Sequence, residues 1–149
     1  MPTYTYKSVE VTGLDQEVPS PLAPDTLGGR VRIARFSVTT TAAAANASTI
    51  ELTRLPVGAV VISGAIKWAD LDSGSGTMDV GYNDGTTTDA DGIASLLDTS
   101  AAGTAALPEA VSFLPIEMAG ASSIYATLNE GTAVLAGLVT GYLLYVVNS

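Results

Sequence analysis

AVVISGAIKWAD, residues 59–70, is the stretch of the sequence that decides the fold. Apolar residues or glycine occupy every second position through its middle, and mostly small or polar residues stand between them. This alternation is typical of a half-buried β-strand, because successive side chains of a strand point to opposite faces. We expect its buried face to comprise Val60, Ile62, Gly64, Ile66 and Trp68. The single tryptophan is therefore expected to pack in the core and not to stack on a sugar.

The segments on either side of this strand carry similar patterns and end in turn residues. TIELTRL (49–55) leads into a turn at PVG (56–58), and TMDVGY (77–82) leads into a turn at NDG (83–85). An Asn-Asp-Gly sequence is a strong turn signal, because these residues tolerate positive φ. Both segments are therefore predicted to be strands joined by short connections.

Further strands are expected towards both ends of the chain. RVRIARFSVTT (30–40) is rich in β-branched residues, and a change of parity among its apolar positions predicts a β-bulge near Ala34. Later strands are predicted at 110–114, 123–128 and 134–147. About eight short strands with turns between them are typical of an all-β sandwich, and we expect a jelly roll.

One segment departs from the strand pattern. DGIASLLD (91–98) begins with an aspartate that can cap a helix, and its apolar residues lie at helix-like spacing. We expect a short helical turn here, with Ile93, Leu96 and Leu97 facing inwards.

The C-terminal run VLAGLVTGYLLYVV (134–147) contains no charged residue and has the GxxxG spacing found in some membrane helices. A membrane-spanning helix needs about 20 apolar residues, usually with basic residues at its ends. This run is shorter, contains Thr140 and two tyrosines, and has no flanking Lys or Arg. We favour a central or interface strand that is buried on both faces, and a membrane anchor is the alternative.

The first 29 residues are predicted to be an arm outside a single sandwich domain of residues 30–149. TYTYKSVEV (3–11) has strand character, and the prolines at 19, 21 and 24 exclude a regular helix after it. We expect the arm to reach a neighbouring subunit or another partner. The alternative is that residues 3–11 form an edge strand of their own domain.

Charge is low in amount and unevenly distributed. The charged fraction is 14% and the net charge is −9, with all six Lys and Arg residues in the first 67 positions. A typical soluble domain has about 25% charged residues. Binding of nucleic acid through its phosphates is therefore not expected, and low charge with abundant small and apolar residues suits protein–protein contact.

The sequence excludes several kinds of chemistry. It contains neither cysteine nor histidine, which removes disulfides, thiol nucleophiles, Ser-His-Asp triads and the usual zinc sites. The acidic segment 79–91 does not fit an EF-hand, although another kind of calcium loop is an open alternative. Paired carboxylates for glycoside hydrolysis are a further alternative, without an accompanying aromatic cluster to support it. We expect no cofactor and no enzymatic activity.

Three segments together resemble a known family. TIELTRLPVGAVVISGAIKW (49–68), TMDVGYNDGTTTDADGIASLLDTSAAG (77–103) and SIYATLNEGTAVLAGLVTGYLLYV (123–146) are similar to small virion structural proteins of tailed bacteriophages. The resemblance implies a β-sandwich or jelly roll that decorates the outside of a capsid as a cement protein, often as a trimer. It also implies the major capsid protein as partner and the virion exterior as location.

The residues suggest where such a partner would bind. Tyr4 and Tyr6 lie on the expected arm strand, and three arginines lie where the arm joins the domain, at Arg30, Arg32 and Arg35. These five residues are the candidate partner-binding residues. The alternative function is a glycan- or receptor-binding head domain of a phage tail fibre, which exposed aromatic residues around an acidic pocket would favour.

Overall fold

The computed structural model describes residues 30–40, 48–72, 74–108, 116–129 and 136–147, and within them the chain forms strands and no helix. In chain order the strands are β1 (Arg32–Thr39), β2 (Ser48–Leu55), β3 (Ala59–Trp68), β4 (Thr77–Asn83), β5 (Thr88–Asp98), β6 (Gly103–Leu107), β7 (Ile116–Glu117), β8 (Ser122–Asn129) and β9 (Leu138–Val147).

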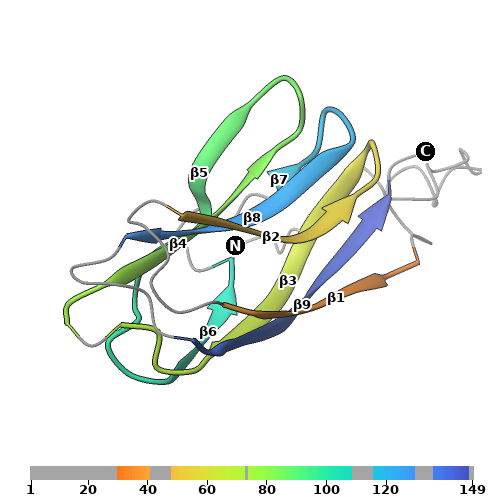
Figure 1. Ribbon diagram of the computed structural model, residues 1–149. Coiled ribbons are helices and arrows are strands. Elements are labelled where there is room, and N and C mark those ends of the chain that lie inside the picture. The colour runs from red at the N-terminus through yellow and green to blue at the C-terminus, as the bar shows by residue number, and fades with distance from the viewer. Residues whose placement is uncertain (1–29, 41–47, 73, 109–115, 130–135, 148–149) are drawn as a thin grey trace, which may run out of the picture.

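Two antiparallel sheets pack against each other in a sandwich (Figure 1). Sheet A has the order β1-β9-β3-β6, with the short β7 paired to β3, and sheet B has the order β2-β8-β4-β5. The chain changes sheet at most of its connections, so β1 pairs with the last strand and β2 with β8. This strand order is that of a jelly roll. The predicted all-β sandwich is therefore confirmed.

The core lies between the inner faces of the two sheets. Leu143 and Ile66 from sheet A meet Met78 and Ile124 from sheet B, and all four side chains are at most 1% exposed. Trp68 lies in the same core, as expected. Its indole Nε1–H donates to the carbonyl oxygens of Asp98 and Ala101, at 2.9 and 3.1 Å.

The register shifts in β2, β3 and β5 but not in β1. The register of β1 against β9 runs without interruption, so the bulge predicted near Ala34 is wrong. In β3 the register shifts after Val61, and the additional residue reverses which positions face the core. Val61 faces the core before the shift and Ile66 after it. Ile62, which was expected inside, is 42% exposed, and Val60 is buried without joining the core cluster.

The helical turn predicted for residues 91–98 is also wrong, because this segment is the second half of β5. The register between β4 and β5 shifts on both sides of Val80. These shifts place additional residues in β5 and give its apolar residues an irregular spacing that resembles a helix. Ile93 and Leu97 are buried as expected, whereas Leu96 is 72% exposed.

The C-terminal run forms β9, which lies in sheet A between β1 and β3. The prediction of a central strand is confirmed, but the expected burial on both faces is wrong, because Leu138 and Tyr142 on one face are 48% and 38% exposed. No helix in the described part of the chain is long and apolar enough to cross a membrane.

Two predicted segments lie outside the described residues: the arm, 1–29, and the strand at 110–114. The sequence did not predict β6 and β7. β6 has the sequence GTAAL, whose glycine and alanines have low β-propensity, and β7 is only two residues long.

Candidate interaction surface

The outer face of sheet A is built mainly from alternate residues of β1, β9 and β3. Residues opposite each other in paired strands share a face of the sheet. Phe36 lies opposite Gly141 and packs in the core, so the residues next to these two along β1 and β9 face outwards. A side chain at Gly141 would collide with the Phe36 ring, whose atoms lie 2.6 and 2.8 Å from where its Cβ would stand. The residues on the opposite side, named here the outer A face, are Ile33, Arg35, Ser37 and Thr39 of β1, Leu138, Thr140, Tyr142, Leu144 and Val146 of β9, and Ser63, Ala65 and Lys67 of β3.

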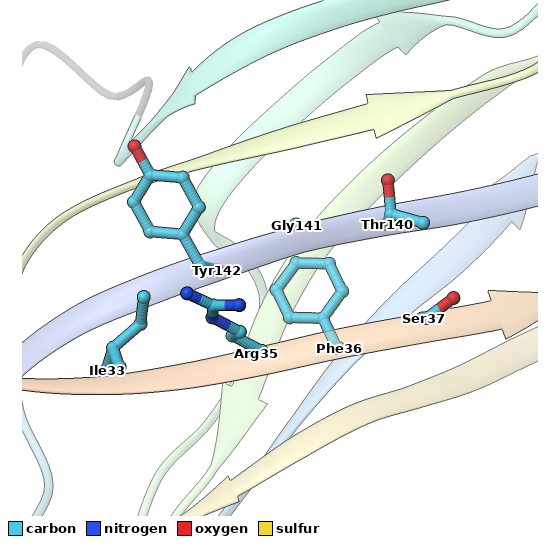
Figure 2. Close-up of a pocket in the computed structure, with 7 residues that line it drawn as sticks. All are labelled: Ile33, Arg35, Phe36, Ser37, Thr140, Gly141 and Tyr142. Carbon is cyan, nitrogen blue, oxygen red and sulfur yellow. The ribbon is translucent and has the colours of Figure 1, made fainter.

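The outer A face exposes large apolar side chains. Ile33 is 49% exposed, Leu138 48% and Tyr142 38%. Figure 2 shows Ile33, Arg35 and Tyr142 around a shallow hollow between β1 and β9, which Ser37 and Thr140 extend along the strands. Adjoining apolar residues exposed on one face are typical of a surface that binds another protein.

The charges that β1 and β3 place on the outer A face are positive and unpaired within the described part of the chain, and the exposed Glu117 of β7, opposite Val60, adds one acid on the same side of sheet A. Arg35 lies directly across from Tyr142, and Lys67 lies across from Thr140. No carboxylate of a described residue forms an ion pair with either cation. The protein as a whole carries a net charge of −9, so a basic and apolar face is a local exception.

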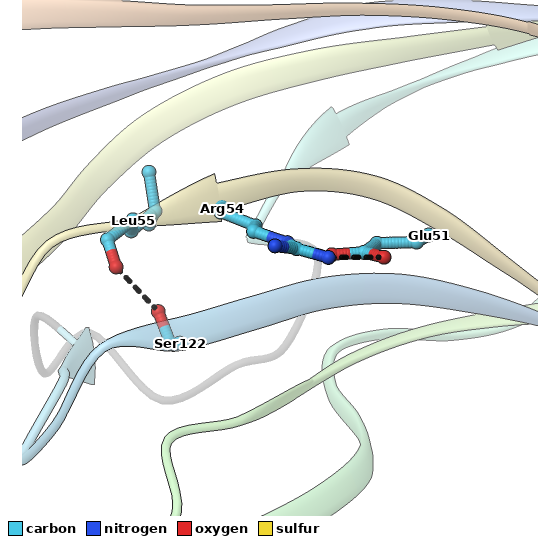
Figure 3. A network of polar contacts seen from close by, with 4 residues as sticks. All are labelled: Glu51, Arg54, Leu55 and Ser122. Atoms are coloured by element: carbon cyan, nitrogen blue, oxygen red, sulfur yellow. Dashed lines mark hydrogen bonds and ion pairs between the residues drawn. The ribbon is translucent and has the colours of Figure 1, made fainter.

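Sheet B has the opposite character. Its described strands carry the acids Glu51, Asp79, Asp89, Asp91 and Asp98. Their one described cation, Arg54, pairs with Glu51 on the same strand (Figure 3), and the arginine holds the pKa of Glu51 below its ordinary value. Both side chains of the pair are exposed, at 79% and 44%, so the pair contributes little to stability.

The other carboxylates with shifted pKa values stabilise turns. The buried Asp84 accepts hydrogen bonds from the backbone N–H groups of Thr86, Thr87 and Ala119, at 2.9, 2.7 and 3.0 Å. These donors, Thr87 first, lower the pKa of Asp84, because they stabilise its ionised form. Ser100 lowers the pKa of Asp98 in the same way. Such carboxylates are poor general acids, because they stay ionised.

The described residues contain no group of three or more carboxylates that could hold a metal ion. The segment considered as a calcium loop forms the end of β4, the turn after it and the beginning of β5. Asp79 within it is already engaged, since it accepts hydrogen bonds from Leu96 and Asn129.

The structure separates the arginines that are adjacent in sequence. All three are exposed, but Arg35 lies on the outer A face, whereas Arg32 lies across from the core-packed Tyr145 on the other side of β1, and Arg30 precedes the strand. Tyr4 and Tyr6 lie outside the described residues. Sequence reasoning missed Tyr142 and Lys67 as partners of Arg35 on this face. Alternation along β9 and β3 shows which of their residues share a face. It shows that this face is the one with Arg35 only once the pairing with β1 is known.

The fold is similar to that of chains in three solved bacteriophage capsid structures. For the "Cyanophage Pam1 capsid asymmetric unit", the TM-score is 0.66 at 22% identity, over 99% of each chain. For the "Capsid of Ralstonia phage GP4", it is 0.63 at 23% identity, over 90% of this chain and 92% of that one. For the "Acidic stable capsid structure of Helicobacter pylori bacteriophage KHP30", it is 0.51 at 15% identity, over 80% and 89% of the two chains. No protein-family model and no curated protein matches the sequence. At these identities the likeness shows that this chain shares the fold.

Proposed function

We propose that this chain is a structural protein of a tailed-phage capsid, and that it decorates and stabilises the outside of the shell by bridging shell subunits. The observation that carries the proposal is the fold match to the cyanophage capsid chain over 99% of both chains. The major capsid protein is the proposed partner.

The polar residues support a structural role. Asp79, Asp84 and Asp98 all accept hydrogen bonds from backbone N–H groups of this chain, so their charges hold the fold together. A glycoside hydrolase needs two carboxylates facing each other across a substrate, one of them protonated. The pKa values of Asp84 and Asp98 are instead lowered.

The outer A face supports assembly into a homo-oligomer, with a trimer as the proposed state. Ile33, Leu138 and Tyr142 would lose their contact with water on association, which is the main source of binding free energy at protein interfaces. A cement protein must in addition bind the shell, and we assign this task to the arm, residues 1–29, with Tyr4 and Tyr6 in the segment predicted to be a strand.

Copy number in purified virions tests the capsid role. Hundreds of copies per particle, seen as density on the capsid exterior by electron microscopy, are the expected result. A handful of copies located at the tail would contradict it and favour the receptor-binding alternative. That alternative also needs an acidic pocket lined by exposed aromatic residues, and the exposed Tyr142 instead lies beside Arg35.

Deletion of residues 1–28 tests the assignment of the arm. The truncated protein should retain its β-sheet circular dichroism signal and bind the capsid much more weakly than the full chain. Unfolding of the truncated protein would show that the arm belongs to its own core, and undiminished binding would show that the arm has no role in attachment.

A further inference from the structure

Leu96 in β5 combines an unusual backbone conformation with high exposure of its side chain. Its φ is 55°, in the left-handed region that a residue with a side chain rarely adopts, and its side chain is 72% exposed. The left-handed conformation is unfavourable for a residue other than glycine. An exposed leucine in this conformation gains little burial within its own chain to offset that cost.

The neighbouring strands hold Leu96 in this position. Its backbone N–H donates to Oδ1 of Asp79 on β4, at 2.7 Å. The other oxygen of the same carboxylate accepts a hydrogen bond from Nδ2 of Asn129 on β8, at 2.6 Å. Two strands of sheet B therefore support the bulge that projects Leu96, so its exposure is a built feature of the sheet.

The strand that carries this apolar projection is acidic. Asp91 and Asp98 of β5 are exposed, and Asp89 is half-buried. A partner surface for β5 should therefore combine a hollow for one aliphatic side chain with positive charge around it. On the described part of this chain, the outer A face has both properties, in the hollow beside Ile33 and Tyr142 and in the cation Arg35.

The charges also decide how two copies can associate. Two outer A faces packed on each other would place Arg35 and Lys67 of both copies in one interface, where like charges repel. Contact between the outer A face of one copy and β5 of the next places opposite charges together. Such a head-to-tail contact is the kind that closes cyclic trimers.

We propose that Leu96 of one copy inserts into the hollow between β1 and β9 on the outer A face of the next copy, with the β5 carboxylates facing Arg35 and Lys67. This inference rests on the homo-oligomer of the proposed function and identifies the two surfaces that form it. It is independent of how the oligomer binds the shell.

Substitution of Leu96 by asparagine tests the apolar contact. Asparagine tolerates the left-handed conformation, so Leu96→Asn should leave the unfolding free energy of the dilute monomer unchanged or slightly raised. The dissociation constant of the oligomer, measured by analytical ultracentrifugation, should rise at least tenfold, as for an interface hot spot. The matched control is Val57→Asn, which replaces another exposed apolar residue, 61% exposed and located in the turn before β3, and should change neither quantity.

A charge exchange tests the pairing of the two surfaces. Arg35→Glu and Asp91→Arg should each raise the dissociation constant about tenfold, because each places like charges in contact. The double variant Arg35→Glu, Asp91→Arg should recover most of the lost affinity. Recovery requires the two positions to meet in different copies, since a face-to-face dimer of outer A faces would not respond to Asp91.

Several results would overturn the inference. A monomer at every accessible concentration, equal dissociation constants for Leu96→Asn and Val57→Asn, or a double variant no better than Arg35→Glu would each do so. Loss of capsid binding by Leu96→Asn with an unchanged oligomer would assign Leu96 to the shell and equally reject a second copy as its partner. These assays use the purified chain without particles, so their failure is distinct from failure of the capsid role, which copy number in virions decides.

Discussion

Sheets A and B share one core but differ in how their outer residues are engaged. On sheet B, Asp79 and Asp98 accept hydrogen bonds from backbone N–H groups, and Glu51 pairs with Arg54. On sheet A, Arg35 and Lys67 have no ion-pair partner among the described residues and stand beside exposed apolar side chains. A face whose polar groups are not needed by its own fold is available for contact with another molecule.

The largest expected effect is a difference in the free energy of unfolding between substitutions on the two sides of β9. Leu143 is fully buried against sheet B, and Leu143→Ala should lower the free energy of unfolding by about 2–5 kcal/mol, since a cavity remains. The adjacent Leu144 lies on the outer A face, and Leu144→Ala should cost less than about 1 kcal/mol in the monomer. Urea unfolding of both variants measures the difference. Equal losses would contradict the assignment of the two faces.

A smaller effect is expected at the contact between Trp68 and the connection from β5 to β6. Trp68→Phe keeps an aromatic ring in the core but removes the donor for the carbonyl oxygens of Asp98 and Ala101. The free energy of unfolding should fall by about 1–3 kcal/mol. The control is Tyr125→Phe on sheet B, whose hydroxyl has no hydrogen bond to a described residue. The free energy of unfolding of this control should stay close to that of the parent. A decrease as large as that of Trp68→Phe would refute the role of the indole N–H.

The Asp84 carboxylate makes the turn after β4 sensitive to acid. Because its pKa is lowered in the folded state, Asp84 contributes stability above the ordinary value of 3.8, and this contribution is lost as pH falls through the folded pKa. Asp84→Asn should therefore be less stable than the parent at neutral pH, and the two should converge in strong acid. Thermal unfolding at a series of pH values measures this, and a difference independent of pH would be the contrary result.

The smallest effect is expected at the exposed pair on β2. Arg54→Gln removes the partner of Glu51 without opening a cavity, and both groups stay in water. The thermal midpoint should scarcely change, and high salt should remove any remaining difference, since salt screens exposed charges. A marked loss of stability would show that sheet B depends on its surface ion pair more than its exposure indicates.

Most of the fold could be predicted because alternation is local. β4 and β8 each show their buried positions directly, as with Met78 and Val80. The bulges in β2, β3 and β5 could not be placed in this way, because a bulge depends on the partner strand. Leu96 shows this most clearly, since its outward position is fixed by Asp79 on β4 and Asn129 on β8.

The candidate surface was predictable only in part. Arg35 was identified from the sequence, but its neighbours on the outer A face come from a strand more than one hundred residues later. A shift of one residue in the pairing of β1 with β9 would have placed Arg35 beside a core residue in place of Tyr142. The register of pairing, which composition and periodicity do not specify, creates this face.

Thiol labelling tests the central claim, because the chain has no cysteine of its own. Ser37→Cys places a thiol on the exposed outer A face, and Val57→Cys places one in the exposed turn before β3, at the control position used for Leu96. On assembled particles, the thiol at position 37 should react far more slowly than in the dilute monomer, whereas the thiol at position 57 should react equally fast in both states. Equal reactivity of the thiol at position 37 in the monomer and on the particle would contradict the account.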